Sequence, residues 1–158
     1  MTSDIFVHIQ GIDGESQDAQ FPKAIQAFHW EHVIEQTSNI HSGSGGGAGK
    51  ASVSDLLFRH DLDRASPNLA KYCQTGKHIP EATLTMRKAG GTPFVYFRIT
   101  MKDVIITKVW PSVDGAHAIE TVGLSFASMK EEYFVQNAQG GNAGAVTVEI
   151  DVKQNRAA

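Results

Sequence analysis

Alternation of apolar and polar residues with a period of two constrains the fold of this chain more than any other feature. The pattern is clear in residues 5–9, 82–87 and 145–152, and it continues through two longer runs, 94–109 and 119–135. Because successive side chains of a strand point to opposite faces, this period is typical of half-buried β-strands. The run 94–109 predicts either one long bent strand or two short ones. The sequence therefore predicts a mainly β protein.

The segment 24–36 is ambiguous. Ile25, Phe28 and His32 have the spacing of a helix face, whereas Phe28 and Trp30 have the spacing of a strand face. Aromatic and β-branched residues pack well on a pleated surface. We therefore favour a strand for this segment.

One short helix is well marked by its ends. Ser66 is a candidate N-cap, Pro67 suits the first helical position, and Gly76 can end the helix in the left-handed conformation. Three residues at i, i+3 and i+4 spacing would then share a face against the core: Leu69, Tyr72 and Cys73.

Together these patterns predict an antiparallel two-sheet β-barrel or sandwich with about seven or eight strands. One short α-helix at about 66–76 flanks it, and a long glycine-rich loop covers 37–52. The length of 158 residues suits one domain, 1–158.

Charge and composition exclude several classes of protein. The chain has 14 Lys+Arg against 17 Asp+Glu, a net charge of −3, so it has no electrostatic basis for binding nucleic acid or an anionic membrane. One cysteine cannot form an internal disulfide. No apolar run is long enough for a membrane-spanning helix, and the first residues lack the features of a signal peptide. We expect synthesis in the cytoplasm without a cleaved signal.

The glycine-rich loop resembles a phosphate-binding loop only at Gly49 and Lys50. Ser44 stands where that motif requires glycine, and Ala51 stands where it requires Ser or Thr for Mg²⁺. A strand pattern follows, where a phosphate site needs a helix N-terminus. A loop of this length is uncommon in a compact domain unless it has a role, so we interpret it as an interaction loop rather than a plain flexible surface loop. Its candidate contact residues are Ser42, Gly43, Ser44, Gly45, Gly46, Gly47, Ala48, Gly49 and Lys50.

Candidate catalytic and metal-binding groups do not cluster. On a strand, His29 and His32 would point to opposite faces and could not share an ion, and Glu131 and Glu132 could not act as a catalytic pair. No nucleophile elbow is present. The charged stretch 60–63 is interpreted as a solvated strand end. The sequence predicts no enzyme, no cofactor and no metal site.

Several segments together resemble the haemolysin-coregulated protein (Hcp) family of type VI secretion. The resemblance is strongest from residue 1 to about 108 and continues only in pattern beyond it. The matching segments are 4–9, 14–16, 45–50, 66–69, 76–78, 84–85 and 87–90, with Trp30, Cys73 and Pro80.

This resemblance implies a fold and a role. Family members are β-barrels of two sheets with one short helix. They form six-membered rings that stack into a tube inside a contractile sheath, and a spike protein caps the tube. Contraction expels the tube from a bacterium into a neighbouring cell, with small effector proteins in the ring lumen. The resemblance also implies that loop 37–52 projects as a contact arm between rings.

Strand alternation then gives a hypothesis for the lumen. If Phe28 and Trp30 face the core, His29, Glu31 and Val33 face the opposite way, towards the lumen and its effectors. Glu31 stands where the resemblance leads us to expect a small polar residue. Repeated around a ring, its charge would favour basic cargo. The alternative is an ordinary solvated strand face.

Two further functions differ in class from a tube subunit. One is a monomeric β-barrel that binds a ligand or acts as a soluble secreted effector. The other is a nucleotide-dependent enzyme, which Ser44 and Ala51 argue against. The long glycine-rich loop favours the tube subunit, because a ligand-binding barrel has no evident use for it.

Overall fold

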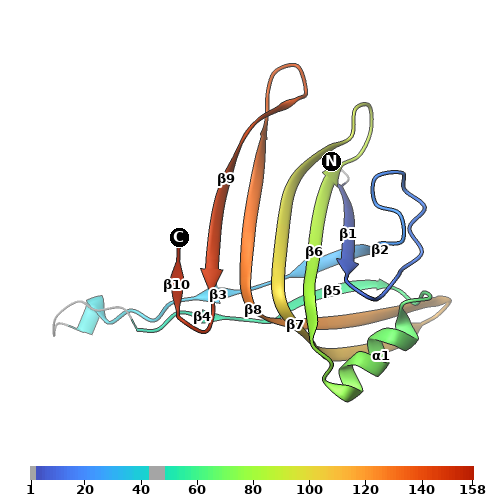
Figure 1. Cartoon of the computed structure of the whole chain (residues 1–158), viewed down its shortest axis with the longest axis horizontal. Helices are drawn as coiled ribbons and strands as arrows, with labels where there is room; N and C mark the ends of the chain where they lie inside the picture. Colours follow the sequence, from blue (N-terminus) through green and yellow to red (C-terminus); the bar gives the residue numbers. More distant parts are fainter. Residues whose placement is uncertain (1–2, 43–48) are drawn as a thin grey trace.

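Strands make up most of the molecule, seen here in a computed structural model that describes residues 3–42 and 49–158 (Figure 1). The elements in chain order are β1 (Ser3–Ile9), β2 (Ile25–Glu31), β3 (Ile34–Glu35), the 3₁₀ turn η1 (Ile40–Ser42), β4 (Ser52–Val53), β5 (Leu56–Asp61), α1 (Ser66–Thr75), β6 (Ile79–Lys88), β7 (Phe94–Asp114), β8 (His117–Gln136), β9 (Asn142–Asp151) and β10 (Arg156–Ala157).

Six of the strands close into a barrel. They follow the order β8-β5-β2-β1-β6-β7, and β7 pairs back onto β8. Strand β8 pairs with two strands along the same edge: its first half pairs with β5, and its second half pairs with β9. Strands β9 and β10 therefore extend the sheet beyond the barrel. The predicted mainly β architecture is confirmed, with ten strands among the described residues, three of them only two residues long.

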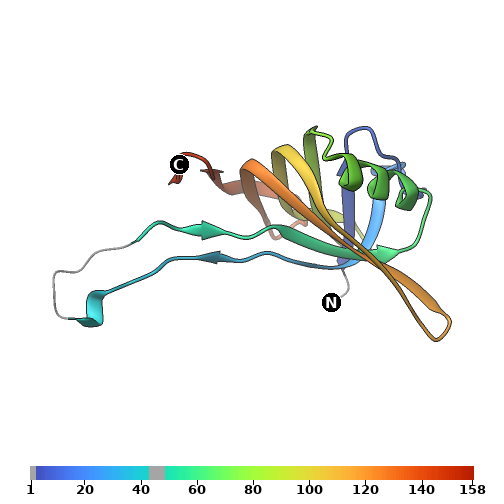
Figure 2. The ribbon, with the colours of Figure 1, turned by 90° about the horizontal axis from the view of Figure 1, so that it is seen from below.

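Strand β7 is one continuous strand of 21 residues, which confirms the long bent alternative. Asp103 takes a left-handed conformation with φ 53°, and the register with β8 shifts between Ile106 and Lys108. These irregularities let the two strands leave one wall of the barrel and cross into the other. The β7–β8 hairpin then projects beyond the barrel (Figure 2).

The core contains the residues that the alternation predicts, with one addition. Val7 and Ile9 are buried on one face of β1, as expected, but Phe6 on the opposite face is buried as well. The segment 11–23 covers it, because Phe21 stacks on Phe6 with ring centroids 4.6 Å apart. Apolar packing therefore extends to both faces of β1.

Arg87 fixes this covering segment. Its guanidinium lies 5.0 Å from the centre of the Phe6 ring and donates to Asp18 Oδ2 at 2.6 Å and Asp4 Oδ2 at 2.9 Å. The hydrogen bond from Arg87 holds the pKa of Asp18 at about 2, with backbone amides of Gln20 and Phe21 contributing in the same direction. Strand β6, which lies far away in the sequence, thus anchors the segment 11–23.

Helix α1 begins one residue earlier than its predicted cap implies. Ala65 occupies the N-cap and Ser66 is already helical, so the predicted role of Ser66 is wrong. No side-chain hydrogen bond caps α1, and just before the helix Asp63 Oδ1 accepts from the amide of Ala65 at 2.8 Å. Gly76 ends the helix with φ 63°, as predicted. With ten residues, α1 is too short to cross a bilayer, and none of the described helices is longer.

Candidate interaction surfaces

A two-stranded arm leaves the barrel after β2 and returns before β5 (Figure 2). Strands β3 and β4 pair at its base, with Ile34 opposite Val53. The amide of Val33 donates to Ser54 Oγ, and the amide of Ser54 donates to Val33 O, both at 2.8 Å. The described parts of the loop predicted for 37–52 therefore continue a paired arm, and the last residue of the predicted loop, Ser52, begins strand β4.

The predicted contact residues of the loop fall into two groups. Gly43, Ser44, Gly45, Gly46, Gly47 and Ala48 lie outside the described residues. Ser42 ends the turn η1, and Gly49 and Lys50 lie on the returning limb. The amide of Gly49 donates to Thr37 O at 3.3 Å, and a side chain at position 49 would collide with the Thr37 hydroxyl. Close approach of the two limbs explains a glycine at this position.

The predicted lumen residues leave the barrel wall at the base of the arm. His29 and Glu31 are exposed on the face of β2 opposite Trp30. Trp30 packs inward, since its ring stacks on Phe97 at 5.7 Å. Val33 is also exposed, where the arm begins.

The premise that Phe28 faces the core is wrong. The register with β5 shifts between Ala27 and His29, which makes Phe28 the extra residue of a β-bulge. Phe28 is 50% exposed and stacks against His117, with centroids 6.2 Å apart. The bulge turns Phe28 outward and returns Trp30 to the core face, so strict alternation fails at one residue.

Cross-strand register completes this outer face. His29 pairs with Arg59, Arg59 with Thr121, and Thr121 with Trp110. One row along, Glu31 pairs with Leu57. The face thus combines both signs of charge with an exposed tryptophan. Sequence reasoning missed Arg59 and Trp110, because no local pattern states which strands are neighbours.

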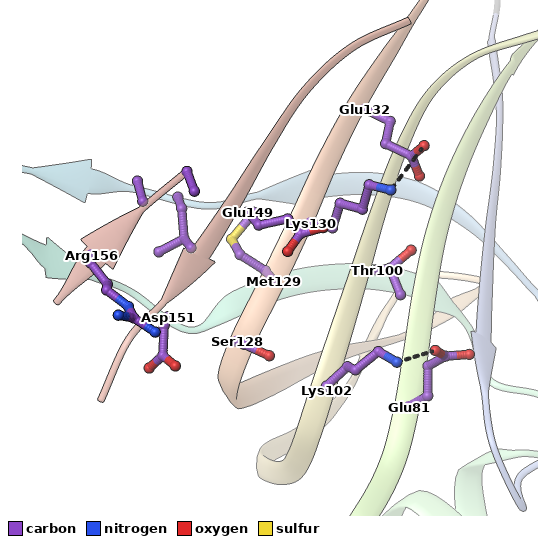
Figure 3. Close-up of a pocket in the computed structure, with 13 residues that line it drawn as sticks. Glu81, Thr100, Lys102, Ser128, Met129, Lys130, Glu132, Glu149, Asp151 and Arg156 are labelled. Carbon is purple, nitrogen blue, oxygen red and sulfur yellow. Dashed lines mark ion pairs between the residues drawn. The ribbon is translucent and has the colours of Figure 1, made fainter. Parts of the chain in front are cut away.

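A hollow of about 780 Å³ opens on the sheet formed by β6 to β10 (Figure 3). Lys102 Nζ lies 3.6 Å from Glu81 Oε1, and Lys130 Nζ lies 3.9 Å from Glu132 Oε2. Of the described residues that line it, none is a histidine or a cysteine. Nowhere in 3–42 or 49–158 do three or more His, Cys, Asp or Glu side chains gather as a metal site would require. The hollow is open, it is lined by both charged and apolar residues, and two of its lysines lie beside carboxylates.

A buried polar cluster lies at the other end of the barrel. His60 Nε2 donates to Glu120 Oε1 at 2.9 Å, and His60 Nδ1 lies 3.7 Å from Asp63 Oδ2. Burial alone lowers the pKa of His60, but the carboxylates of Asp63 and Glu120 outweigh it and raise the pKa. The stretch 60–63 was predicted to be solvated, and this is wrong for His60, which β8 covers by pairing with β5.

His32 marks the junction of the barrel and the arm. It lies against the Phe126 ring at 5.9 Å, and its Nε2 is 3.5 Å from Met129 Sδ. Burial lowers the pKa of His32, and the charge of Glu131 opposes this effect. The imidazole therefore packs against Phe126 and Met129 where the arm leaves the barrel.

Residues 6–133 match the family described as "Type VI secretion system effector, Hcp". The chain belongs to the Hcp family. Among curated proteins, it is 38% identical to Protein hcp1 of Pseudomonas aeruginosa over 159 residues, which covers 98% of each chain. The similarity therefore continues past residue 108, where the motifs become weak.

Solved Hcp structures share the fold. Hcp1 from Salmonella typhimurium is 45% identical, with a TM-score of 0.83 and complete coverage of both chains. A type VI secretion system effector from Yersinia pestis is 36% identical, with a TM-score of 0.79, and the match covers 94% of this chain and all of that one. The barrel with its projecting arm is thus an Hcp fold.

Proposed function

We propose that this Hcp-family chain is a structural subunit of the type VI inner tube. Six copies form a ring, rings stack into a tube, and sheath contraction expels the tube with its spike. Small effector proteins travel in the lumen. The chain reaches the outside through this apparatus and acts without catalysis, cofactor or metal.

The projecting arm is the observation that supports this proposal most directly. Its two limbs extend far from the barrel (Figure 2) and expose Val33, Ile34 and Ile40 to solvent. Ordering such a segment costs conformational entropy, and exposed aliphatic side chains return nothing to an isolated chain. Contact with another subunit would bury them. We therefore assign the arm, including 42–50, to contacts between stacked rings.

Free strand edges support ring formation. Within the described residues, the 142–149 part of β9 pairs only with β8 and, at its last residue, with Ala158. The 107–114 part of β7 likewise pairs only with β8. Unpaired edges invite association with another chain, and a closed ring of head-to-tail contacts would cover them in every subunit.

The outer face of β2 is the proposed lumen wall. His29 Nε2 and Glu31 Oε1 are 4.0 Å apart and both side chains are about half exposed, so the pair is weak and Glu31 keeps its charge available. Six copies of Glu31 around a pore would attract basic effector surfaces, because a ring of like charges concentrates its field in the lumen.

The first test is mass in solution. Light scattering on a sizing column, with negative-stain images of the same peak, should give six times the chain mass of 17.1 kDa and ring-shaped particles. A monomer at every concentration tested would contradict the ring and favour the monomeric barrel or soluble effector.

The second test concerns the lumen. Effectors should co-purify less well with Glu31→Ser, whereas Glu35→Ser, which removes an exposed acid in the arm, should retain them. Unchanged retention in Glu31→Ser would refute the charge argument while leaving the ring intact.

A further inference from the structure

The dipeptide Asp–Gly occurs twice in the chain, at 13–14 and at 114–115. This dipeptide is reactive, because glycine has no side chain to shield its amide nitrogen from the carboxyl group of the preceding aspartate. The nitrogen can attack that carboxyl carbon and close a five-membered succinimide ring. The reaction needs a free amide and a backbone that can turn, so the surroundings of the two copies decide which of them reacts.

The first copy is held firmly at its glycine. The amide of Gly14 donates to Lys23 O at 2.7 Å, and Gly14 is buried. Two residues later, the amide of Ser16 donates to Ala24 O at 3.0 Å. A side chain at position 14 would collide with the backbone of Ala24, so the packing here is close. The segment 11–23 must therefore open before its Asp–Gly bond can react.

The second copy lies in an exposed turn. Asp114 and His117 form the last pair of the β7–β8 ladder, and Gly115 and Ala116 make the two-residue turn between them. All four residues are exposed, at the free end of the projecting hairpin (Figure 2). Within residues 3–42 and 49–158, the Gly115 amide has no hydrogen-bond acceptor, and the Asp114 carboxylate has no hydrogen bond or ion pair.

Opening of one strand pair is enough to free this turn. Ring closure requires rotation about the Cα–C bond of Asp114, which breaks its pairing with His117. The last pair of a hairpin opens at little cost in free energy. The next pair is Val113 with Ala118, and Ala118 O also accepts from the amide of Leu62 at 3.2 Å. The opening is therefore confined to the tip.

We propose that Asp114 is a site of spontaneous isoaspartate formation at the tip of the β7–β8 hairpin. The amide nitrogen of Gly115 attacks the carboxyl carbon of Asp114 in its acid form, and a C–N bond forms. The hydroxyl group leaves as water with the proton of the amide. Water then adds back to the succinimide. Opening at the side-chain carbonyl restores aspartate, and opening at the backbone carbonyl gives isoaspartate.

Isoaspartate changes both the backbone and the charge at the tip. The main chain now runs through the side-chain methylene of residue 114, and the former backbone carbonyl becomes a free carboxylate. Isoaspartyl methyltransferases transfer a methyl group from S-adenosylmethionine to such a carboxylate, so the tip becomes a modification site as the protein ages. The inference goes beyond the proposed function and does not depend on ring formation.

Ageing of the full chain in neutral buffer tests the proposal. After digestion, isoaspartate is recognised in peptides with altered retention and unchanged mass, which separates it from deamidated asparagine. Isoaspartate at 114 should exceed that at 13 by at least about tenfold, which corresponds to about 1.4 kcal/mol of extra opening free energy at Gly14. In urea, where neither site is folded, the two should react alike.

Asp114→Glu is the matched variant. It keeps the negative charge at an exposed position, and its longer side chain cannot close the five-membered ring. The aged folded wild type should accept methyl groups from S-adenosylmethionine when an isoaspartyl methyltransferase is added. The aged Asp114→Glu variant should lose most of this signal.

The contrary results are distinct. Equal isoaspartate at 13 and 114 in the folded chain would overturn the inference, because the hydrogen bond and burial of Gly14 would then give no protection. Isoaspartate at 114 that forms in urea but not in the folded chain would overturn it as well, since the turn would be held in place. Methyl acceptance that is unchanged in Asp114→Glu would assign the reaction to another residue.

Discussion

Removal of the buried carboxylate of Glu120 should destabilise the barrel strongly. In the folded chain Glu120 accepts from His60 at 2.9 Å, and the side chains of His60 and Glu120 are 0% and 3% exposed. The contact joins β5 to β8, and Asp63 beside it accepts from the amide of Ala65 just before α1. Glu120→Ala leaves the buried imidazole of His60 with one carboxylate partner, Asp63, at 3.7 Å.

The expected size of the loss follows from burial. Breaking a buried ion pair by removing one partner costs about 3–5 kcal/mol. Because the carboxylate of Asp63 remains near His60, we expect Glu120→Ala to lose about 3 kcal/mol of unfolding free energy. For a domain of this length, that corresponds to a fall in Tm of about 6–12 °C. Urea unfolding at two protein concentrations measures the loss and separates it from assembly.

A second histidine–carboxylate pair on the same two strands is the matched control. His117 Nε2 lies 2.7 Å from Asp61 Oδ1, but these side chains are 65% and 68% exposed. Asp61→Ala should cost less than about 1 kcal/mol, because solvent screens an exposed pair. Equal losses in Glu120→Ala and Asp61→Ala would refute the reasoning that burial, rather than distance, sets the cost.

The stability that Glu120→Ala loses should depend on pH. The folded-state pKa of His60 lies above its ordinary value of 6.5. The stabilisation is therefore complete below pH 6.5 and is lost as the pH rises through the raised value. The difference between wild type and Glu120→Ala should shrink from acid to alkaline pH. A difference that grows with pH would contradict the assignment.

Three further predictions follow from single contacts. Gly76→Ala should cost about 1 kcal/mol in thermal unfolding, because φ is 63° and no atom crowds the site. Arg87 lowers the pKa of Asp18 to about 2, so the Asp18 carboxylate stabilises the fold above its ordinary pKa of 3.8. This stabilisation is lost as the pH falls towards 2, and Asp18→Asn should therefore make acid unfolding depend less steeply on pH. Gly49→Ala should speed amide exchange in the arm, and adding Thr37→Ala should restore protection, since it removes the hydroxyl that the new methyl group would meet.

Local patterns predicted the elements well where one residue type has one physical consequence. Gly76 ends α1 because only glycine takes the left-handed conformation without cost, and the pattern of 119–135 became β8. The prediction failed at Phe28, where a single bulge reverses the alternation, and at Ser66, which is already helical because Ala65 occupies the N-cap. The failure at Phe28 depends on the pairing of β2 with β5, which the sequence does not state.

The candidate surfaces divide in the same way. The exposure of His29 and Glu31 on the face opposite Trp30 was readable from period two, since alternation is a property of one strand. Arg59 and Trp110 joined that face only through register, which depends on how β5, β7 and β8 pair. The role of His60 was misjudged for the same reason, because Glu120 lies 60 residues away in the chain.

By itself, the sequence determined the strand-rich class, the short helix, the long glycine-rich segment and the family, because these follow from local period, end signals and motifs. Only the tertiary structure decided which apolar faces the chain covers. Val7 and Val146 belong to equally clear alternating patterns, yet Val7 is buried and Val146 is exposed. A sequence pattern shows that a face is apolar, but burial is a relation between two surfaces, and the alternation describes only one of them.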